Sequence, residues 1–155
     1  MIRLANTEDA YLIHQIMVLA FEEYRDMDVP SSALNETVSS IEESLKNGSE
    51  KALLCFRDGV PVGSVRFKTV KNSLYFFRLS VSPEARGKGI AKSILTWLEN
   101  YAKEYKKTEI WCRVRMSLPQ NIQLYNSVGY IVCKEEVVTN PNGFSVKTVV
   151  MKKEI

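Results

Sequence analysis

The residues best suited to chemistry lie at 86–89, where Arg86, Gly87, Lys88 and Gly89 stand directly before a helical pattern. The first N–H groups of a helix lack backbone partners, and the helix dipole places partial positive charge there. Glycine lets the backbone approach an anion closely, and the two basic side chains add charge. This stretch is therefore either a solvated basic turn or a cradle for an anion such as a pyrophosphate.

Two common nucleotide-binding loops do not match this stretch. The P-loop sequence GxxxxGK followed by Ser or Thr is absent, because the residues after Gly89 are Ile-Ala-Lys-Ser. The sequence GxGxxG is also absent, because Lys92 stands where the third glycine would be. Neither a P-loop kinase nor a Rossmann enzyme is favoured.

Hydrophobic periodicity predicts the elements that would position this stretch. They are a strand at 2–5, a helix capped by Asn6 or Thr7, a loop at 24–36, a second helix ending at Asn47-Gly48, a hairpin at 51–70 turning at Asp58-Gly59, a strand at 73–81, a helix at about 87–105, a strand at 108–114, a helix from Pro119 to Gly129, and a final hairpin across residues 140–143. This order predicts a mixed α/β fold with helices on both faces of one sheet.

The helical patterns also predict which side chains are buried. In the first helix Leu12, Ile16, Leu19, Ala20 and Tyr24 recur at helical spacing, which predicts an apolar face. In the long helix the predicted apolar stripe consists of Ile90, Ile94, Leu95, Leu98, Tyr101 and Tyr105.

Composition narrows the class of protein. The chain has 155 residues, which predicts a single domain over residues 1–155. Its formal net charge of +3 is too mild for a nucleic-acid-binding protein, which needs a focused basic stripe. The sequence has neither an apolar leader nor a run of membrane-spanning length, so we expect a cytoplasmic protein that does not enter a membrane.

The three cysteines argue against a metal site. Cys55, Cys112 and Cys133 are far apart, odd in number and without CxxC spacing, so neither a zinc site nor a disulfide scaffold is favoured. Each lies in an apolar, strand-like segment, which predicts buried free thiols.

Two motifs carry a resemblance to a known family. Residues 86–91 read Arg-x-x-Gly-x-Ala after a strand and at the start of a long helix, and residues 121–130 read NIQLYNSVGY. Both are similar to segments of the GNAT superfamily of acetyl-coenzyme A-dependent N-acetyltransferases, the second to its Asn…Leu-Tyr…Gly-Phe/Tyr segment. The predicted element order is similar over nearly the whole chain. The resemblance implies a mixed, mostly antiparallel central sheet of about seven strands flanked by about four helices.

The resemblance also implies site residues for acetyl-CoA. The backbone of Leu79 and Val81 would pair with the pantetheine arm, which requires the fourth and fifth strands to splay apart, and amides of the glycine loop would hold the pyrophosphate. Asn121 would contact the pantetheine or phosphate region. The full implied set is Leu79, Ser80, Val81, Arg86, Gly87, Lys88, Gly89, Ile90, Ala91, Lys92, Ser93 and Asn121.

Acetyl transfer to an amine requires a neutral amine, a stabilised oxyanion and a protonated leaving thiolate. The resemblance places Tyr125 near the thioester sulfur, which makes it the candidate general acid; the alternative is a core tyrosine on an amphipathic helix. A cysteine nucleophile is disfavoured because no histidine lies near any of the three cysteines in the sequence. We therefore expect direct attack in a ternary complex.

The general base stays open. Many members of the family place a glutamate on the strand before the pyrophosphate loop, but this chain has Phe76, Phe77 and Arg78 there. Other carboxylates that could act directly or through water belong to the end of the first helix and its loop: Glu22, Glu23, Asp26 and Asp28. An acceptor amine of low pKa would need no dedicated base.

The acceptor is the least determined part. Glu22, Tyr24, Tyr75 and Phe77 are candidate acceptor-binding residues, and the acidic segment suits a cationic amine on a small molecule or a peptide. A homodimer through the C-terminal hairpin is an option that the sequence leaves open. The alternative to an enzyme is a non-catalytic sensor or regulatory module that binds acyl-CoA, which the missing strand carboxylate favours.

Overall fold

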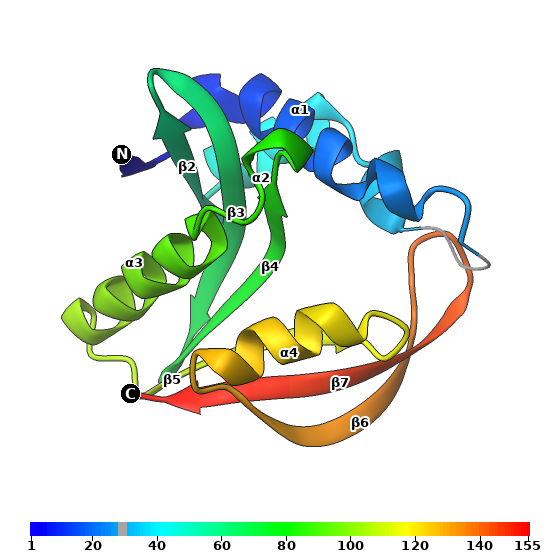
Figure 1. Cartoon of the computed structure of the whole chain (residues 1–155). Coiled ribbons are helices and arrows are strands. Elements are labelled where there is room, and N and C mark those ends of the chain that lie inside the picture. Colours follow the sequence, from blue (N-terminus) through cyan, green and yellow to red (C-terminus); the bar gives the residue numbers. More distant parts are fainter. Residues whose placement is uncertain (28–30) are drawn as a thin grey trace. The chain divides into compact units, whose positions relative to one another are not determined.

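Seven strands form one hydrogen-bonded sheet in the computed structural model of the chain, which describes residues 1–27 and 31–155 (Figure 1). Their order in the sheet is β1-β2-β3-β4-β5-β7-β6. β1–β2, β2–β3, β5–β7 and β6–β7 pair antiparallel, whereas β4–β5 is parallel. The bounds are β1 Ile2–Leu4, β2 Lys51–Arg57, β3 Val60–Val70, β4 Ser73–Val81, β5 Glu109–Arg115, β6 Ile131–Thr139 and β7 Ser145–Glu154.

Four α-helices occur in the described ranges. They are α1 (Ala10–Phe21), α2 (Val38–Lys46), α3 (Ile90–Glu104) and α4 (Pro119–Ser127). Short 3-10 helices flank them, namely η1 (Thr7–Asp9), η2 (Glu22–Tyr24), η3 (Ser32–Asn35) and η4 (Pro83–Ala85). The mixed, mostly antiparallel sheet and the helix count confirm the predicted fold class. No helix among the described residues is both long and apolar enough to cross a bilayer.

The chain forms two compact units. One comprises Met1–Lys68 and Phe77–Leu98, and the other comprises Thr69–Phe76 and Glu99–Ile155. Strands β3 and β4 and helix α3 contribute residues to both units.

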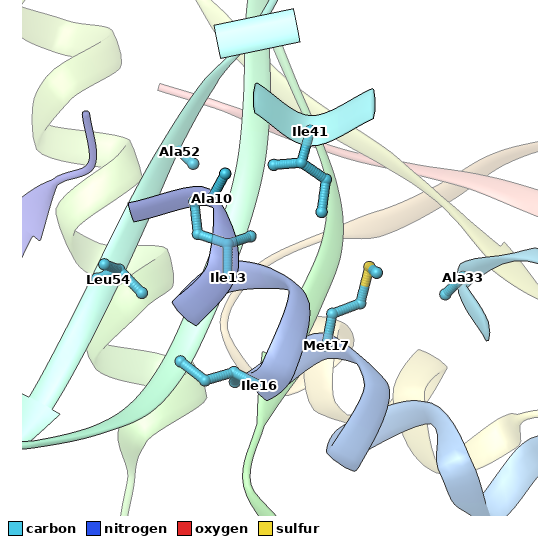
Figure 2. Packing of buried hydrophobic residues seen from close by; sticks show 8 residues of the cluster. All are labelled: Ala10, Ile13, Ile16, Met17, Ala33, Ile41, Ala52 and Leu54. Atoms are coloured by element: carbon cyan, nitrogen blue, oxygen red, sulfur yellow. The ribbon is translucent and has the colours of Figure 1, made fainter. Parts of the chain in front are cut away.

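The core of the first unit lies between α1, α2 and strand β2 (Figure 2). The 3-10 helix η1, directly before α1, starts at a capping box formed by Asn6 and Asp9, which satisfies N–H groups at the start of η1. The fully or nearly buried members of this cluster are Ala10, Ile13, Ile16, Met17, Ala33, Ile41, Ala52 and Leu54. Their removal from water supplies most of the stabilisation of this unit.

The predicted buried face of the first helix was partly wrong. Leu19 is 49% exposed, whereas Ile13 and Met17 are buried. The segment 10–21 is apolar on almost every side, so periodicity alone could not choose the face that meets β2.

The long helix agrees better with its predicted pattern. Ile90, Ile94, Leu95, Leu98 and Tyr101 are buried, but Tyr105 is 56% exposed and lies just beyond the end of α3. The helix begins at Ile90, later than the predicted start at about residue 87, because Gly87 and Gly89 adopt positive φ angles.

The prediction of three buried thiols holds for two of them. Cys55 and Cys112 are buried, whereas Cys133 is exposed. Cys133 lies on β6, an edge strand, at an irregularity in its pairing with β7 between Val132 and Lys134. An edge strand with a bulge covers fewer of its side chains than a central strand does.

A buried ion-pair network joins β3 to the α1–α2 segment within the first unit. Arg66 is 6% exposed and bonds both Glu36 and Glu50, the latter at 2.7 Å. Glu36 also accepts a hydrogen bond from Arg78 at 2.8 Å, and Arg78 donates a further one to the Ser32 hydroxyl at 2.9 Å. The two arginines and two carboxylates balance each other in charge.

Arg66→Met is expected to lower the free energy of unfolding by about 3–5 kcal/mol, because it leaves two largely buried carboxylates without their shared cation. Urea denaturation of the variant measures this loss. Arg25→Met is the matched control, since Arg25 pairs with Glu22 where both side chains are about half exposed (54% and 51%). That change should cost less than about 1 kcal/mol. Equal effects would contradict a structural role for the buried network.

Candidate functional site

The glycine-rich stretch forms an exposed loop between η4 and the start of α3. Pro83 starts η4, and the loop then runs through Gly87 and Gly89 with φ angles of +76° and +78°. Such angles are strained for residues with a side chain, which explains glycine at both positions. A Cβ atom placed on either glycine would meet nothing within 4 Å, so the space in front of the loop is open.

Backbone donors line this loop. Among the hydrogen bonds of the described residues, none is donated by the backbone N–H groups of residues 87–92, and the N–H of Ser93 bonds the Gly89 carbonyl at 3.0 Å. Because three of these free groups lie in the first turn of α3, the dipole of a 15-residue helix adds positive potential there. The loop therefore offers a run of unpaired donors to an anion.

Side chains around the loop bond mainly to neighbouring protein. Lys88 Nζ donates to the Glu84 carbonyl at 3.4 Å, and the Ser93 hydroxyl donates to the Gly89 carbonyl at 3.0 Å. Arg86 bonds the end of α1 and Glu23. Lys92 is exposed on the first turn of α3. The anion-binding capacity of the loop thus lies chiefly in its backbone.

The strand before the loop carries an irregular residue. Arg78 has a φ of +56°, unusual for a residue with a long side chain, and its guanidinium is anchored by Ser32 and Glu36. After it come Leu79 and Val81, which are half-buried, and Ser80, which is fully buried. The first unit therefore contains all the predicted cofactor-binding residues from Leu79 to Ser93.

The described pairs between β4 and β5 are Ser73↔Glu109, Leu74↔Ile110 and Tyr75↔Trp111. Beyond Tyr75 no further β4–β5 pair is found among the described residues, although β4 continues to Val81 and β5 to Arg115.

The second unit holds the remaining candidates, Asn121 and Tyr125, on α4. Tyr125 is 8% exposed, and its ring centroid lies 5.7 Å from that of Phe76 and 5.9 Å from that of Tyr130. Burial strongly raises the pKa of the Tyr130 hydroxyl. Asn121 is half-buried in the first turn of α4.

The acceptor candidates are spread over both units. Glu22 and Tyr24 are in η2, where Arg25 holds Glu22 with contacts of 2.6 and 2.9 Å and lowers the pKa of its carboxyl. Phe77 stacks beneath the Arg66 guanidinium at 5.1 Å. In the second unit, Tyr75 packs on Trp111 with ring centroids 4.3 Å apart.

The candidate bases differ in their surroundings. Glu22 is paired with Arg25, which lowers the pKa of its carboxyl and makes it a poor proton acceptor, and Glu23 is paired with Arg86. Asp26 is exposed, and Asp28 lies outside the described residues. No group of three or more His, Cys, Asp or Glu side chains that could hold a metal ion occurs within 1–27 and 31–155.

Sequence reasoning missed the link from Arg78 to Ser32 and Glu36. The partners are 46 and 42 residues apart in the chain, and no local pattern marks such a pair. The only signal in the sequence was the basic residue Arg78 within an otherwise mostly apolar predicted strand.

The family model described as "Acetyltransferase (GNAT) family" matches residues 13–130. A ribosomal-protein-alanine N-acetyltransferase from Brucella melitensis is 20% identical, with 100% of this chain and 99% of that one covered and a TM-score of 0.80. No curated protein matches the sequence.

Two further solved structures share the fold. A mutant of the spermidine N-acetyltransferase from Vibrio cholerae is 18% identical, with 99% and 94% of the chains covered and a TM-score of 0.75. A putative acetyltransferase from Salmonella typhimurium, solved with its cofactor acetyl-CoA, is 19% identical, with 99% and 92% covered and a TM-score of 0.72. At these identities the likeness concerns the fold. Because the family model spans most of the sequence, and the glycine loop lies within the matched residues, this chain belongs to the GNAT acetyltransferase family.

Proposed function

We propose that this protein is an N-acetyltransferase that moves an acetyl group from acetyl-CoA to a primary amine on a small molecule or a peptide. The observation that carries the proposal is the run of unpaired backbone N–H groups at residues 87–92, in an open glycine loop at the start of α3. This is a site for a diphosphate, and the family uses acetyl-CoA.

The residues present fit coenzyme A. The N–H groups of Gly87 to Lys92 would hold its pyrophosphate, and the exposed Lys92 ammonium would add charge at the edge. The backbone of Leu79 and Val81 would bond the pantetheine arm as a short added strand. Bound acetyl-CoA supplies an activated acetyl group as its thioester. By the family resemblance, Asn121 would contact the pantetheine or phosphate region.

Tyr125 would act as the general acid that protonates the leaving sulfur. A tyrosine hydroxyl, with an ordinary pKa of about 10, can donate a proton to the leaving sulfur. The proton it gives up would be regained from solvent in each cycle. Direct transfer needs no covalent acyl-enzyme. Cys55 and Cys112 are buried, which raises the pKa of both thiols, and the exposed Cys133 thiol donates to the Val150 carbonyl at 3.4 Å.

The amine has to be neutral before it attacks. β4 carries no carboxylate, and Glu22 and Glu23 are paired, so we propose that the proton leaves to water or through the exposed Asp26. An acceptor whose amine pKa lies near neutrality, such as a peptide N-terminus, would need the least help. The named relatives act on ribosomal-protein alanine and on spermidine, which gives the two amine classes to compare first.

The test is a panel of primary amines assayed with acetyl-CoA by the release of free thiol. The panel should contain peptides with an N-terminal alanine, polyamines and small amino compounds. Thiol release above the amine-free background by one class supports the enzyme and names its acceptor. Intersecting double-reciprocal lines in both substrates would support direct transfer, whereas parallel lines would contradict it.

The alternative is a module that binds acyl-CoA without turnover, and the lack of a carboxylate on β4 is the observation that favours it. Calorimetric titration with acetyl-CoA separates the two. Tight binding together with no thiol release from any amine would favour the module over the enzyme.

A further inference from the structure

The Arg86 side chain connects the glycine loop to the end of α1. Its Nη1 atom lies 3.0 Å from Glu23 Oε2, and its Nη2 atom donates to the Ala20 carbonyl at 3.1 Å. These partners are 63 and 66 residues away in the chain, and all three residues belong to the first unit. The contact is therefore a tertiary link between the loop proposed to hold the donor and the end of α1, next to the acceptor candidates Glu22 and Tyr24.

The end of α1 has an electrostatic need that Arg86 meets. The last turn of α1 carries no basic residue, and η2 directly after it begins with Glu22 and Glu23. The C-terminal carbonyls of a helix carry partial negative charge and are stabilised by a nearby cation. Arg86 supplies this cation to the Ala20 carbonyl and neutralises Glu23 at the same time.

The link is of little use for overall stability. The Arg86 and Glu23 side chains are 41% and 46% exposed, and ion pairs of that exposure contribute little. A contact that is weak in stability but joins two substrate-binding segments is better explained by positioning. The contact between Arg86 and Glu23 holds η2 against the glycine loop. η2 contains the acceptor candidates Glu22 and Tyr24, and the loop is proposed to hold the donor.

The loop does not need the Arg86 guanidinium for the anion. The unpaired N–H groups of residues 87–92 and the exposed Lys92 remain available while Arg86 keeps both of its contacts. Moving the guanidinium onto a phosphate would cost the bonds to Ala20 and Glu23. Donor binding is thus a task for the backbone of the loop, while the Arg86 side chain stays bonded to Ala20 and Glu23 at the end of α1.

We propose that Arg86 is a positioning residue. Its guanidinium ties the end of α1 and Glu23 to the glycine loop, and this link orders residues 20–25, which include the acceptor candidates Glu22 and Tyr24. The guanidinium does not bind the coenzyme A diphosphate. This role rests on the proposed function. It predicts that loss of the guanidinium weakens binding of the acceptor and spares binding of the donor.

The experiment compares Arg86→Ala, Arg86→Lys and Glu23→Gln with the unchanged chain. For Arg86→Ala, the KM of the best acceptor from the amine panel should rise up to about fivefold, the most expected from losing a favourable exposed cation at a helix end. The Kd of coenzyme A, measured by calorimetry, should change by less than about twofold. Arg86→Lys should recover part of the acceptor KM, and Glu23→Gln should raise it by less than Arg86→Ala does.

A second readout does not depend on turnover. Hydrogen exchange of amides at residues 20–25 should be faster in Arg86→Ala, because the end of α1 loses its tether. Lys88→Ala is the matched control, since it removes a loop charge whose ammonium bonds the Glu84 carbonyl and should leave exchange at residues 20–25 unchanged. If the unchanged chain acetylates no amine, the proposed enzyme fails, while exchange and coenzyme A binding still decide the role of Arg86.

Two results would overturn the assignment. A rise of tenfold or more in the Kd of coenzyme A for Arg86→Ala, with unchanged exchange at residues 20–25, would make Arg86 a phosphate ligand. Equal acceleration of exchange in Lys88→Ala would show that general loop charge, and not the link to Ala20 and Glu23, orders the segment.

Discussion

Gly89→Glu is expected to abolish coenzyme A binding, with a loss of affinity of at least roughly 100-fold. The substitution places a carboxylate in the open space in front of Gly89, where nothing lies within 4 Å and where the diphosphate is proposed to sit. Two like charges about 4 Å apart near a protein surface repel by about 4 kcal/mol, which alone exceeds that loss. Calorimetric titration with coenzyme A measures the affinity directly.

Backbone strain has to be separated from this effect, because Gly89 has a φ of +78° and any side chain is strained there. Gly48→Glu is the matched control, since Gly48 has the same φ of +78° and equally open surroundings, but follows α2 instead of starting α3. Both variants should lose a similar amount of thermal stability. If Gly89→Glu binds coenzyme A as tightly as Gly48→Glu does, the loop is not the diphosphate site.

The glycine loop could be predicted from sequence because everything that makes it is local. Glycine at positive φ, proline at the start of η4 and the helical pattern after Ile90 are all properties of neighbouring residues. The strand order of the sheet was not predicted; the family resemblance implied only a mixed, mostly antiparallel sheet of about seven strands. Local pattern predicted the helix that carries Tyr125, although its surroundings of Phe76 and Tyr130 could not be derived from spacing.

What escaped prediction depends on contacts between distant residues. Leu12, Ile13, Ile16, Met17 and Leu19 are all apolar, so only the position of β2 decides which of them are buried. The ion pairs of Arg86 with Glu23 and of Arg66 with Glu36 also escaped prediction, because the partners are far apart in the sequence.

Unpredicted ion pairs also change what the acidic residues Glu22 and Glu23 say about the acceptor. In the sequence, Glu22 and Glu23 indicate an attractive surface for a cationic amine. In the structure, Arg25 and Arg86 hold these carboxylates, so they offer less negative charge than the sequence implies. An acceptor class inferred from local charge alone would therefore overstate the preference for polyamines.

Tyr125→Phe is expected to lower kcat by about 10²–10³-fold while changing the Kd of coenzyme A by less than about twofold, because only the proton donor is removed. The buried ring keeps its contacts with Phe76 and Tyr130, so the packing of α4 should be preserved. Steady-state rates with the acceptor found in the amine panel measure the effect.

Tyr130→Phe is the matched control for Tyr125→Phe. Tyr130 is 2% exposed, its ring centroid lies 6.0 Å from that of Phe76, and its position in the 121–130 motif accepts either Phe or Tyr in the family pattern. Because burial holds the pKa of Tyr130 far above its usual range, its hydroxyl is a weak acid and its loss should change kcat by less than about threefold. Equal losses in both variants would indicate that the aromatic cluster matters for packing. An unchanged kcat in Tyr125→Phe would remove Tyr125 as the acid and leave water to protonate the thiolate.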